Sequence, residues 1–142
     1  MNQYSVLRAR QQKEIDAFPF MFAFSQKQFD EGMIRLGLKP TDTHKIYSIG
    51  AGGYIRKSDS PAMHKMLDRH AAEMQAAIDA DETGEGFVKD MFLYELDNHE
   101  YSYTWDLEPT LDALGLTVDQ VVENTKLHHG LIEARKVIRR RG

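Results

Sequence analysis

The chain has 142 residues, of which 42% are hydrophobic and 28% charged, with only 4 prolines and 10 glycines, a composition typical of one folded globular domain. It contains no cysteine, which excludes disulfide frameworks, thiol nucleophiles, iron–sulfur clusters and thiolate zinc sites. The formal net charge of −4 is segregated, because eight of the 18 basic residues and none of the 22 acids lie in residues 1–13 and 134–142, which leaves residues 14–133 at −12.

The N-terminal residues lack the apolar core of a secretory signal. The longest strongly apolar run, residues 18–24, is too short to span a bilayer. We therefore expect an acidic, cytoplasmic protein with no membrane partner.

The first part of the chain predicts a helix, a strand and a second helix. Residues 3–17 are polar and helix-permissive. Residues 18–24 are rich in large apolar side chains but contain Pro19, which favours an edge or first strand. Ser25 with Gln28 has the spacing of a capping box and opens a helix that Gly37 ends.

Residues 45–49 and 54–56 flank the glycine-rich stretch 50–53, which predicts a hairpin. A phosphate loop is disfavoured, because Arg56 stands where a Walker loop needs the glycine that precedes its lysine. Asp59 or Ser60 then caps an amphipathic helix that runs to about residue 78.

The C-terminal half predicts a loop at 81–86, a helix at 87–98, a strand at 101–105 and a short helix from Glu108 to Gly115. Thr117 and Gln120 form a second capping box, which opens a long final helix to about Arg140.

These elements predict a single α+β domain over residues 1–142, mainly helical, with the glycine-rich hairpin in a small antiparallel sheet and a long C-terminal helix. The sheet is built from residues 20–24, 45–49 and 53–56, with 101–105 as a candidate fourth strand. The apolar arc of the final helix is wider than one docking surface needs, so this helix is a candidate seam for a homo-oligomer.

The most distinctive segment is 92–105, which holds five of the chain's 14 aromatic residues and its only tryptophan, interleaved with acids. Aromatic side chains dominate many interfaces, so the leading hypothesis is a non-enzymatic protein-interaction module. We expect the partner to contact four aromatic anchors, Tyr94, Tyr101, Tyr103 and Trp105, while Glu95, Asp97 and Glu100 set the sign of its charge.

The alternative is nucleic-acid binding through the basic ends, if they form one patch. The residues concerned are Arg8, Arg10, Lys13, Arg135, Lys136, Arg139, Arg140 and Arg141. The competing interpretation is that these cations give solubility and complement helix dipoles.

The third hypothesis is a metal-dependent enzyme. His64 and Asp68 lie four residues apart on one predicted helix, as do Glu95 and His99 on another, so two packed helices could supply four ligands. Neither pair has the Glu-x-x-His spacing of di-iron carboxylate bundles or the His-Glu-x-x-His spacing of zinc proteases, and no serine lies in a Gly-x-Ser-x-Gly elbow. We therefore expect no enzymatic activity, metal or cofactor.

Three stretches resemble an uncharacterised family of small proteins encoded in bacterial phages and mobile elements. They are residues 22–38, 50–59 and 93–116, with the strings FAFS, GAGG, LYEL, NHEY and LDALGL. Both basic ends lie outside the resemblance. It implies a role in binding and modulating a host or element protein, including inhibition of a defence system.

Overall fold

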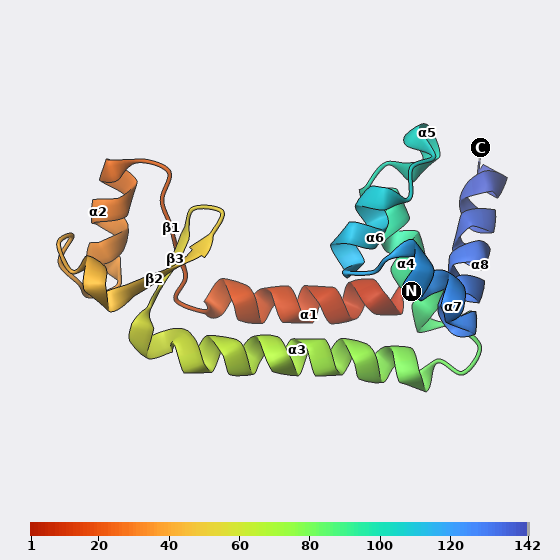
Figure 1. Cartoon of the computed structure of the whole chain (residues 1–142), viewed down its shortest axis with the longest axis horizontal. Helices are drawn as coiled ribbons and strands as arrows, with labels where there is room; N and C mark the ends of the chain where they lie inside the picture. The colour runs from red at the N-terminus through yellow and green to blue at the C-terminus, as the bar shows by residue number, and fades with distance from the viewer. Residues whose placement is uncertain (142) are drawn as a thin grey trace. The chain divides into compact units, whose positions relative to one another are not determined.

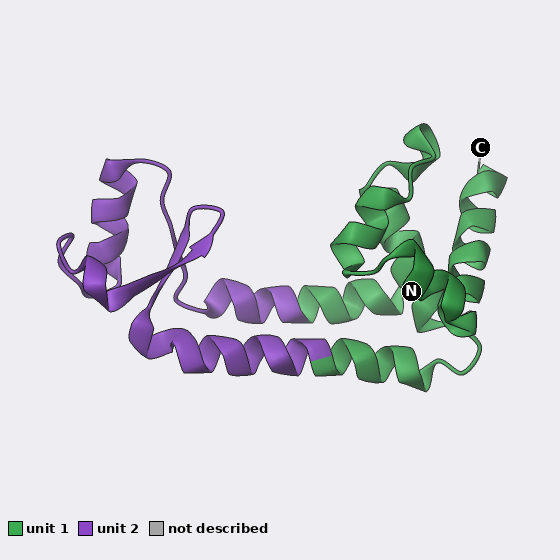
Figure 2. Ribbon diagram, viewed as in Figure 1, with its two compact units in different colours: residues 1–10, 72–142 green, residues 11–71 purple. Residues whose placement is uncertain are grey.

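The computed structural model describes residues 1–141 (Figure 1). It is 70% helical with one three-stranded antiparallel sheet, which confirms the predicted mainly helical α+β fold. The chain forms two compact units, Gln11–Ala71 and a second one made of Met1–Arg10 with Ala72–Gly142 (Figure 2). The single domain predicted over residues 1–142 stays a prediction. No helix within residues 1–141 is both long and apolar enough to cross a membrane.

The unit 11–71 contains the sheet and one complete α-helix. Its elements are the end of α1 (Gln3–Ala17), β1 (Met21–Phe22), α2 (Gln26–Arg35), the 3₁₀ turns η1 (Thr43–Lys45) and η2 (Lys57–Asp59), β2 (Ile46–Gly50), β3 (Gly53–Arg56) and the start of α3 (Ser60–Ala80). The strand order is β1-β3-β2, with Met21 opposite Tyr54 and Tyr47 opposite Ile55. Strand β1 therefore lies at an edge, as Pro19 predicts.

Local capping explains where α2 begins. The backbone N–H of Gln28 donates to Ser25 Oγ at 3.2 Å, and the Gln28 side chain accepts from the N–H of Phe24 at 2.8 Å. The reciprocal bond thus reaches one residue further back than a strict capping box. Helix α2 covers a small core in which Met21 lies directly against Gly32, where a side chain would meet Met21 Cγ.

The unit made of residues 1–10 and 72–142 is helical. It holds the start of α1, the end of α3, α4 (Phe87–Asn98), α5 (Tyr101–Thr104), α6 (Glu108–Leu114), α7 (Val118–Glu123) and α8 (Thr125–Arg141). Its core gathers Tyr4, Val88, Phe92, Leu96, Tyr101, Leu111, Val121, Leu131, Ala134 and Ile138, among others.

In this unit the predicted strand at 101–105 is wrong, and the predicted C-terminal helix begins later than expected. Residues 101–105 form one helical turn rather than a strand, because Glu100 (φ 59°) and Trp105 (φ 55°) adopt left-handed conformations that close the turn at both ends. The burial of Tyr101 outweighs the strand propensity of its neighbours. The segment therefore adds no fourth strand to the sheet.

The predicted long C-terminal helix is confirmed as α8, but it begins at Thr125 rather than at the Thr117 cap. The Thr117 and Gln120 capping box is present, but it opens only the short α7. At Asn124 the backbone is extended, and the Asn124 side chain accepts from the N–H of Leu127 at 3.0 Å, so a second cap starts α8.

Candidate functional site

The segment from Tyr94 to Trp105 contributes both to the core and to the surface. Tyr101 and Glu95 are each 1% exposed, whereas Tyr103 is 85% and Trp105 57% exposed. Tyr94 is half-buried, and its ring meets that of Tyr4 edge to face. Tyr101 and Glu95 are therefore not surface contacts, and the burial of these two side chains corrects the expectation that they meet a partner.

Tyr101 joins α5 to α8. Its phenol oxygen accepts a 2.8 Å hydrogen bond from Arg135 Nε, and the Arg135 guanidinium lies 5.7 Å from the ring centre. The Trp105 ring packs edge to face on Tyr101 at 5.4 Å. The indole is thereby held by a buried ring while most of its own surface stays open to solvent.

A hollow of about 480 Å³ lies beside these rings. We call it the α5–α8 groove, and its lining residues are Asp97, Ser102, Tyr103, Trp105, Ile138, Arg139 and Arg141. Arg141 Nη1 donates to both carboxylate oxygens of Asp97 at 2.9 Å, which connects α8 to α4 along the groove. The groove therefore brings together two sets of residues that the sequence assigned to rival functions.

The charges around the groove are not those of the three acids that the sequence predicts to contact the partner. Glu95 is buried, and Asp97 is paired with Arg141. Arg139 and Arg140 are exposed and form no ion pair with any residue of the described chain, 1–141. Of the three predicted acids, Glu100 alone is exposed and without an ion pair within that range.

Glu95 instead forms part of an internal polar cluster. Arg8 Nη1 lies 2.6 Å from Glu95 Oε1 and 3.4 Å from the Tyr4 hydroxyl, and His99 Nε2 lies 3.7 Å from Glu95 Oε2. Burial raises the pKa of Tyr4, and the Glu95 carboxylate adds to this effect. The cluster fixes the N-terminal helix to α4, which is a structural task.

The other cations of the predicted basic patch have separate positions. Arg10 pairs with Glu73 at 2.9 Å, and Lys136 pairs with Glu133 at 3.0 Å. Lys13 is exposed in the unit 11–71. Of the five cations predicted at the C-terminal end, Arg139 and Arg140 are therefore the two with no side-chain partner within residues 1–141.

The two predicted metal-ligand pairs lie on different units. His64 and Asp68 are exposed on α3, where His64 Nδ1 lies 2.9 Å from the Ser60 carbonyl oxygen. Glu95 and His99 share one face of α4, as their spacing predicts, but Arg8 binds the Glu95 carboxylate. The Glu95 and His99 pair is therefore explained by the internal cluster.

A second exposed apolar surface lies on the sheet of the unit 11–71. Phe22 is 52%, Phe24 77% and Tyr47 48% exposed. The Phe24 ring lies over Gly52, where a Cβ would come within 2.5 Å of it. Apart from the predicted strand at 18–24, no sequence signal marked this surface.

The wide apolar arc predicted for the final helix is shared between α7 and α8. Leu131, Ala134 and Ile138 are buried in the core of the unit. Val118 and Val122, on the outer side of α7, are 60% and 57% exposed. The residues left for a homo-oligomer seam are therefore mainly on α7.

Sequence comparison identifies one related family. Residues 3–137 match a family of unknown function, DUF7659. No curated protein and no solved structure is significantly similar to the chain. This confirms that the resemblance is to an uncharacterised family, while the origin of that family in phages and mobile elements stays a prediction.

Proposed function

We propose that this chain, which belongs to the DUF7659 family, is a non-enzymatic protein-interaction module that binds its partner in the α5–α8 groove. The observation that carries the proposal is the pair of exposed rings, Tyr103 and Trp105, next to Arg139. Tyrosine, tryptophan and arginine are the residues that most often dominate binding energy at interfaces.

The charge of the groove defines the partner segment. Because Asp97 is already neutralised by Arg141, Arg139 is the one charged residue of the groove lining that has no ion pair within residues 1–141. A complementary segment carries carboxylates next to an apolar or aromatic side chain. We therefore infer an acidic partner, the opposite of the sign that the aromatic segment alone suggested.

Backbone conformation supports a recognition role for α5. Glu100 and Trp105 hold left-handed conformations that glycine adopts more easily, with φ of 59° and 55°. Such positions tend to cluster at binding sites, where a fixed geometry is retained despite local strain. The single helical turn between them presents the Tyr103 ring without further support.

The resemblance to proteins of phages and mobile elements indicates the class of partner. We propose a cytoplasmic protein of the host or of the element, including a component of a defence system. The groove suits binding better than acid–base catalysis. Asp97 is the one acidic residue among the described residues that line it, and both of its carboxylate oxygens accept hydrogen bonds from Arg141.

Selection and titration of peptides test the proposal. A displayed library of acidic and aromatic peptides is panned against the whole protein, and selected peptides are titrated by calorimetry. We expect Tyr103→Ala with Trp105→Ala to weaken binding at least about a hundredfold, since anchor residues are each worth ~2 kcal/mol or more. Phe24→Ala, which removes an exposed ring from the other unit, is the matched control and should bind as wild type.

Two results would contradict the proposal: a library that yields no binder, or selected peptides that bind the double variant as tightly as wild type. Circular dichroism of both variants verifies that the helical fold is retained.

Single-stranded nucleic acid is a second candidate ligand for the α5–α8 groove, favoured by the same exposed rings next to an arginine. Exposed rings beside Arg139, which has no ion pair within residues 1–141, can stack bases and contact phosphates. The candidate predicts that a labelled oligonucleotide binds at about 50 mM salt and much more weakly at about 200 mM. It also predicts loss of binding in Arg139→Ser with Arg140→Ser, and equal binding by wild type and this variant would exclude it.

A further inference from the structure

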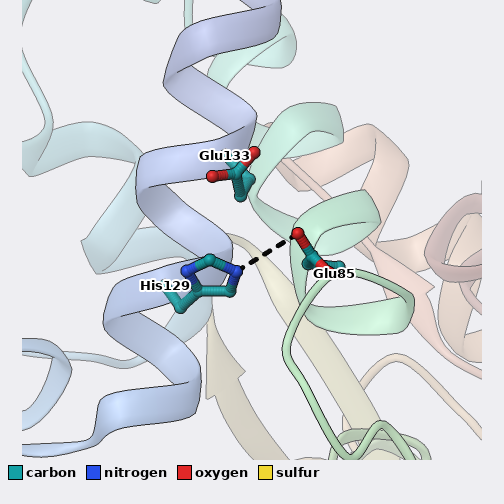
Figure 3. A group of neighbouring side chains, drawn as sticks. All are labelled: Glu85, His129 and Glu133. Carbon is teal, nitrogen blue, oxygen red and sulfur yellow. Dashed lines mark ion pairs between the residues drawn. The ribbon is translucent and has the colours of Figure 1, made fainter.

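Three potential metal ligands meet where the loop before α4 touches α8 (Figure 3). Glu85, His129 and Glu133 each offer one ligand atom, and these atoms lie within 4.8 Å of one another. His129 Nε2 is 3.3 Å from Glu85 Oε1. Within residues 1–141, this is the one group of three such side chains that close together.

Helix geometry places two of the ligands on one face. His129 and Glu133 are four residues apart on α8, so their side chains project from the same side in successive turns. His128 is the adjacent residue, about 100° further around the helix, and it is exposed and outside the group.

The third ligand comes from a loop with a fixed conformation. The Asp81 carboxylate accepts hydrogen bonds from the backbone N–H groups of Gly84, Gly86 and Val88 at 3.0, 3.1 and 2.9 Å. These bonds lower the pKa of Asp81 against the opposing effect of desolvation. Residue Glu85 is therefore held between two anchored glycines.

Close packing presses this loop against α8. A Cβ at Gly130 would lie 2.5 Å from Val88 Cγ1 and 2.8 Å from the Gly84 carbonyl oxygen. The backbone of the loop thus meets the helix at the residue that follows His129. The separation of Glu85 from His129 is set by this packing and by the Asp81 bonds, without help from a bound ion.

We propose that Glu85, His129 and Glu133 bind a divalent transition-metal ion, with Zn²⁺ as the best match. One imidazole and two carboxylates are ligands that zinc accepts, and three protein ligands leave a coordination position for water. Magnesium and calcium prefer sites made of oxygen atoms alone. A bound cation would also offset the repulsion between the two carboxylates.

Lys136 is compatible with the site. Its Nζ lies 3.0 Å from Glu133 Oε1, which leaves the second carboxylate oxygen of Glu133 for a metal ion. The metal site shares no residue with the α5–α8 groove, so its failure would leave the proposed function untouched.

The test uses untagged full-length protein freed of metal by a chelator, titrated with zinc chloride by calorimetry. We expect saturable binding of one ion and a Tm that rises with zinc concentration, because the ion links the loop to α8. His129→Ala and Glu85→Gln should each weaken binding about tenfold or more, since even partners outside the ligand shell are worth that much. His128→Ala, the matched control, should bind as wild type.

Three outcomes would overturn the site. They are heat signals that do not saturate at millimolar zinc, affinity that survives in both His129→Ala and Glu85→Gln, and equal loss in His128→Ala. Glu85→Gln guards against misfolding as an explanation, because Glu85 is exposed and a glutamine occupies nearly the same volume. Zinc binding that millimolar magnesium displaces would also count against the proposed ligand set.

Discussion

Arg135 donates a 2.8 Å hydrogen bond to the phenol of Tyr101, a residue whose side chain is almost wholly buried. Arg135, a cation of the basic C-terminal end, thus stabilises the fold and is not available to bind a ligand. At the other basic end, Arg8 is likewise occupied by its ion pair with the buried Glu95. Among the predicted site residues of this unit, the side chains that are exposed and have no ion pair within residues 1–141 are Tyr103, most of Trp105, Glu100, Arg139 and Arg140.

The pair of Arg8 and Glu95 gives the first prediction. Arg8→Met leaves the Glu95 carboxylate, 1% exposed, without its cation, so we expect a loss of about 2–3 kcal/mol in the free energy of unfolding. Denaturation by urea measures it. Arg10→Met, which breaks a more exposed pair with Glu73, should cost less than about 1 kcal/mol. Equal losses in the two variants would contradict the structural role of Glu95.

Gly130 gives the second prediction. A methyl group there would meet both Val88 and the Gly84 carbonyl, so Gly130→Ala should destabilise the contact between α4 and α8 by about 1–3 kcal/mol. Gly115→Ala is the matched control: it has open space around it and φ of 68°, so backbone strain of about 1 kcal/mol is its main cost. Thermal unfolding of both variants checks the order, and a Gly130→Ala protein as stable as wild type would be inconsistent with the packing.

Much of the fold could be predicted because its elements begin and end with local signals. Ser25 and Thr117 cap helices through their own side chains, Gly37 and Gly115 take left-handed φ values after helices, and the glycines at 50–53 turn a hairpin. These signals act over a few residues, which is the range that sequence patterns report. Asn124 is such a signal too, since it caps α8, and it was missed inside an otherwise apolar helical pattern.

The site was harder to predict because it depends on contacts between distant residues. Tyr101 and Tyr103 are two positions apart and chemically identical, yet one is 1% and the other 85% exposed. They differ because Tyr101 packs in the hydrophobic core of the unit and accepts a hydrogen bond from Arg135, whereas Tyr103 lies outside that core. The metal ligands Glu85 and His129 are 44 positions apart, and no spacing rule joins a loop residue to a helix. The spacing of His129 and Glu133 was the available clue.

Trp105 gives the third prediction, which concerns strain. With φ of 55°, this position favours glycine over any residue with a Cβ by about 1–2 kcal/mol. Trp105→Gly should therefore be more stable than Trp105→Ala, although both lose the ring contact with Tyr101. Urea unfolding of the two variants measures the difference. An alanine variant as stable as the glycine variant would remove the argument that α5 retains strain for recognition.

Glu14 gives the fourth prediction, which concerns pH. Its hydrogen bond with Arg69 is the main cause that lowers the pKa of Glu14 from 4.5 to about 2. Because the folded pKa lies below the unfolded one, the stabilisation is complete above about pH 4.5 and is lost as the pH falls toward 2. Glu14→Gln should thus be less stable than wild type at pH 6, with a smaller difference at pH 3. Glu31→Gln, which alters an exposed glutamate, should show no such convergence.

The sign of charge around Trp105 gives the last prediction. Trp105 is the only tryptophan, so its fluorescence reports the groove alone. Arg139 and Arg140 should concentrate iodide and repel caesium. Relative to quenching of free tryptophan by the same ion, iodide should therefore quench more strongly than caesium at about 20 mM ionic strength, where the Debye length exceeds 10 Å. The difference should shrink at about 0.5 M salt, where charges are screened. Acrylamide, which is neutral, supplies the correction for exposure.

Arg139→Ser with Arg140→Ser should lower iodide quenching without changing acrylamide quenching. Stronger quenching by caesium would mean that the acids Glu100 and Asp106 dominate the groove, and the partner segment would then have to be basic.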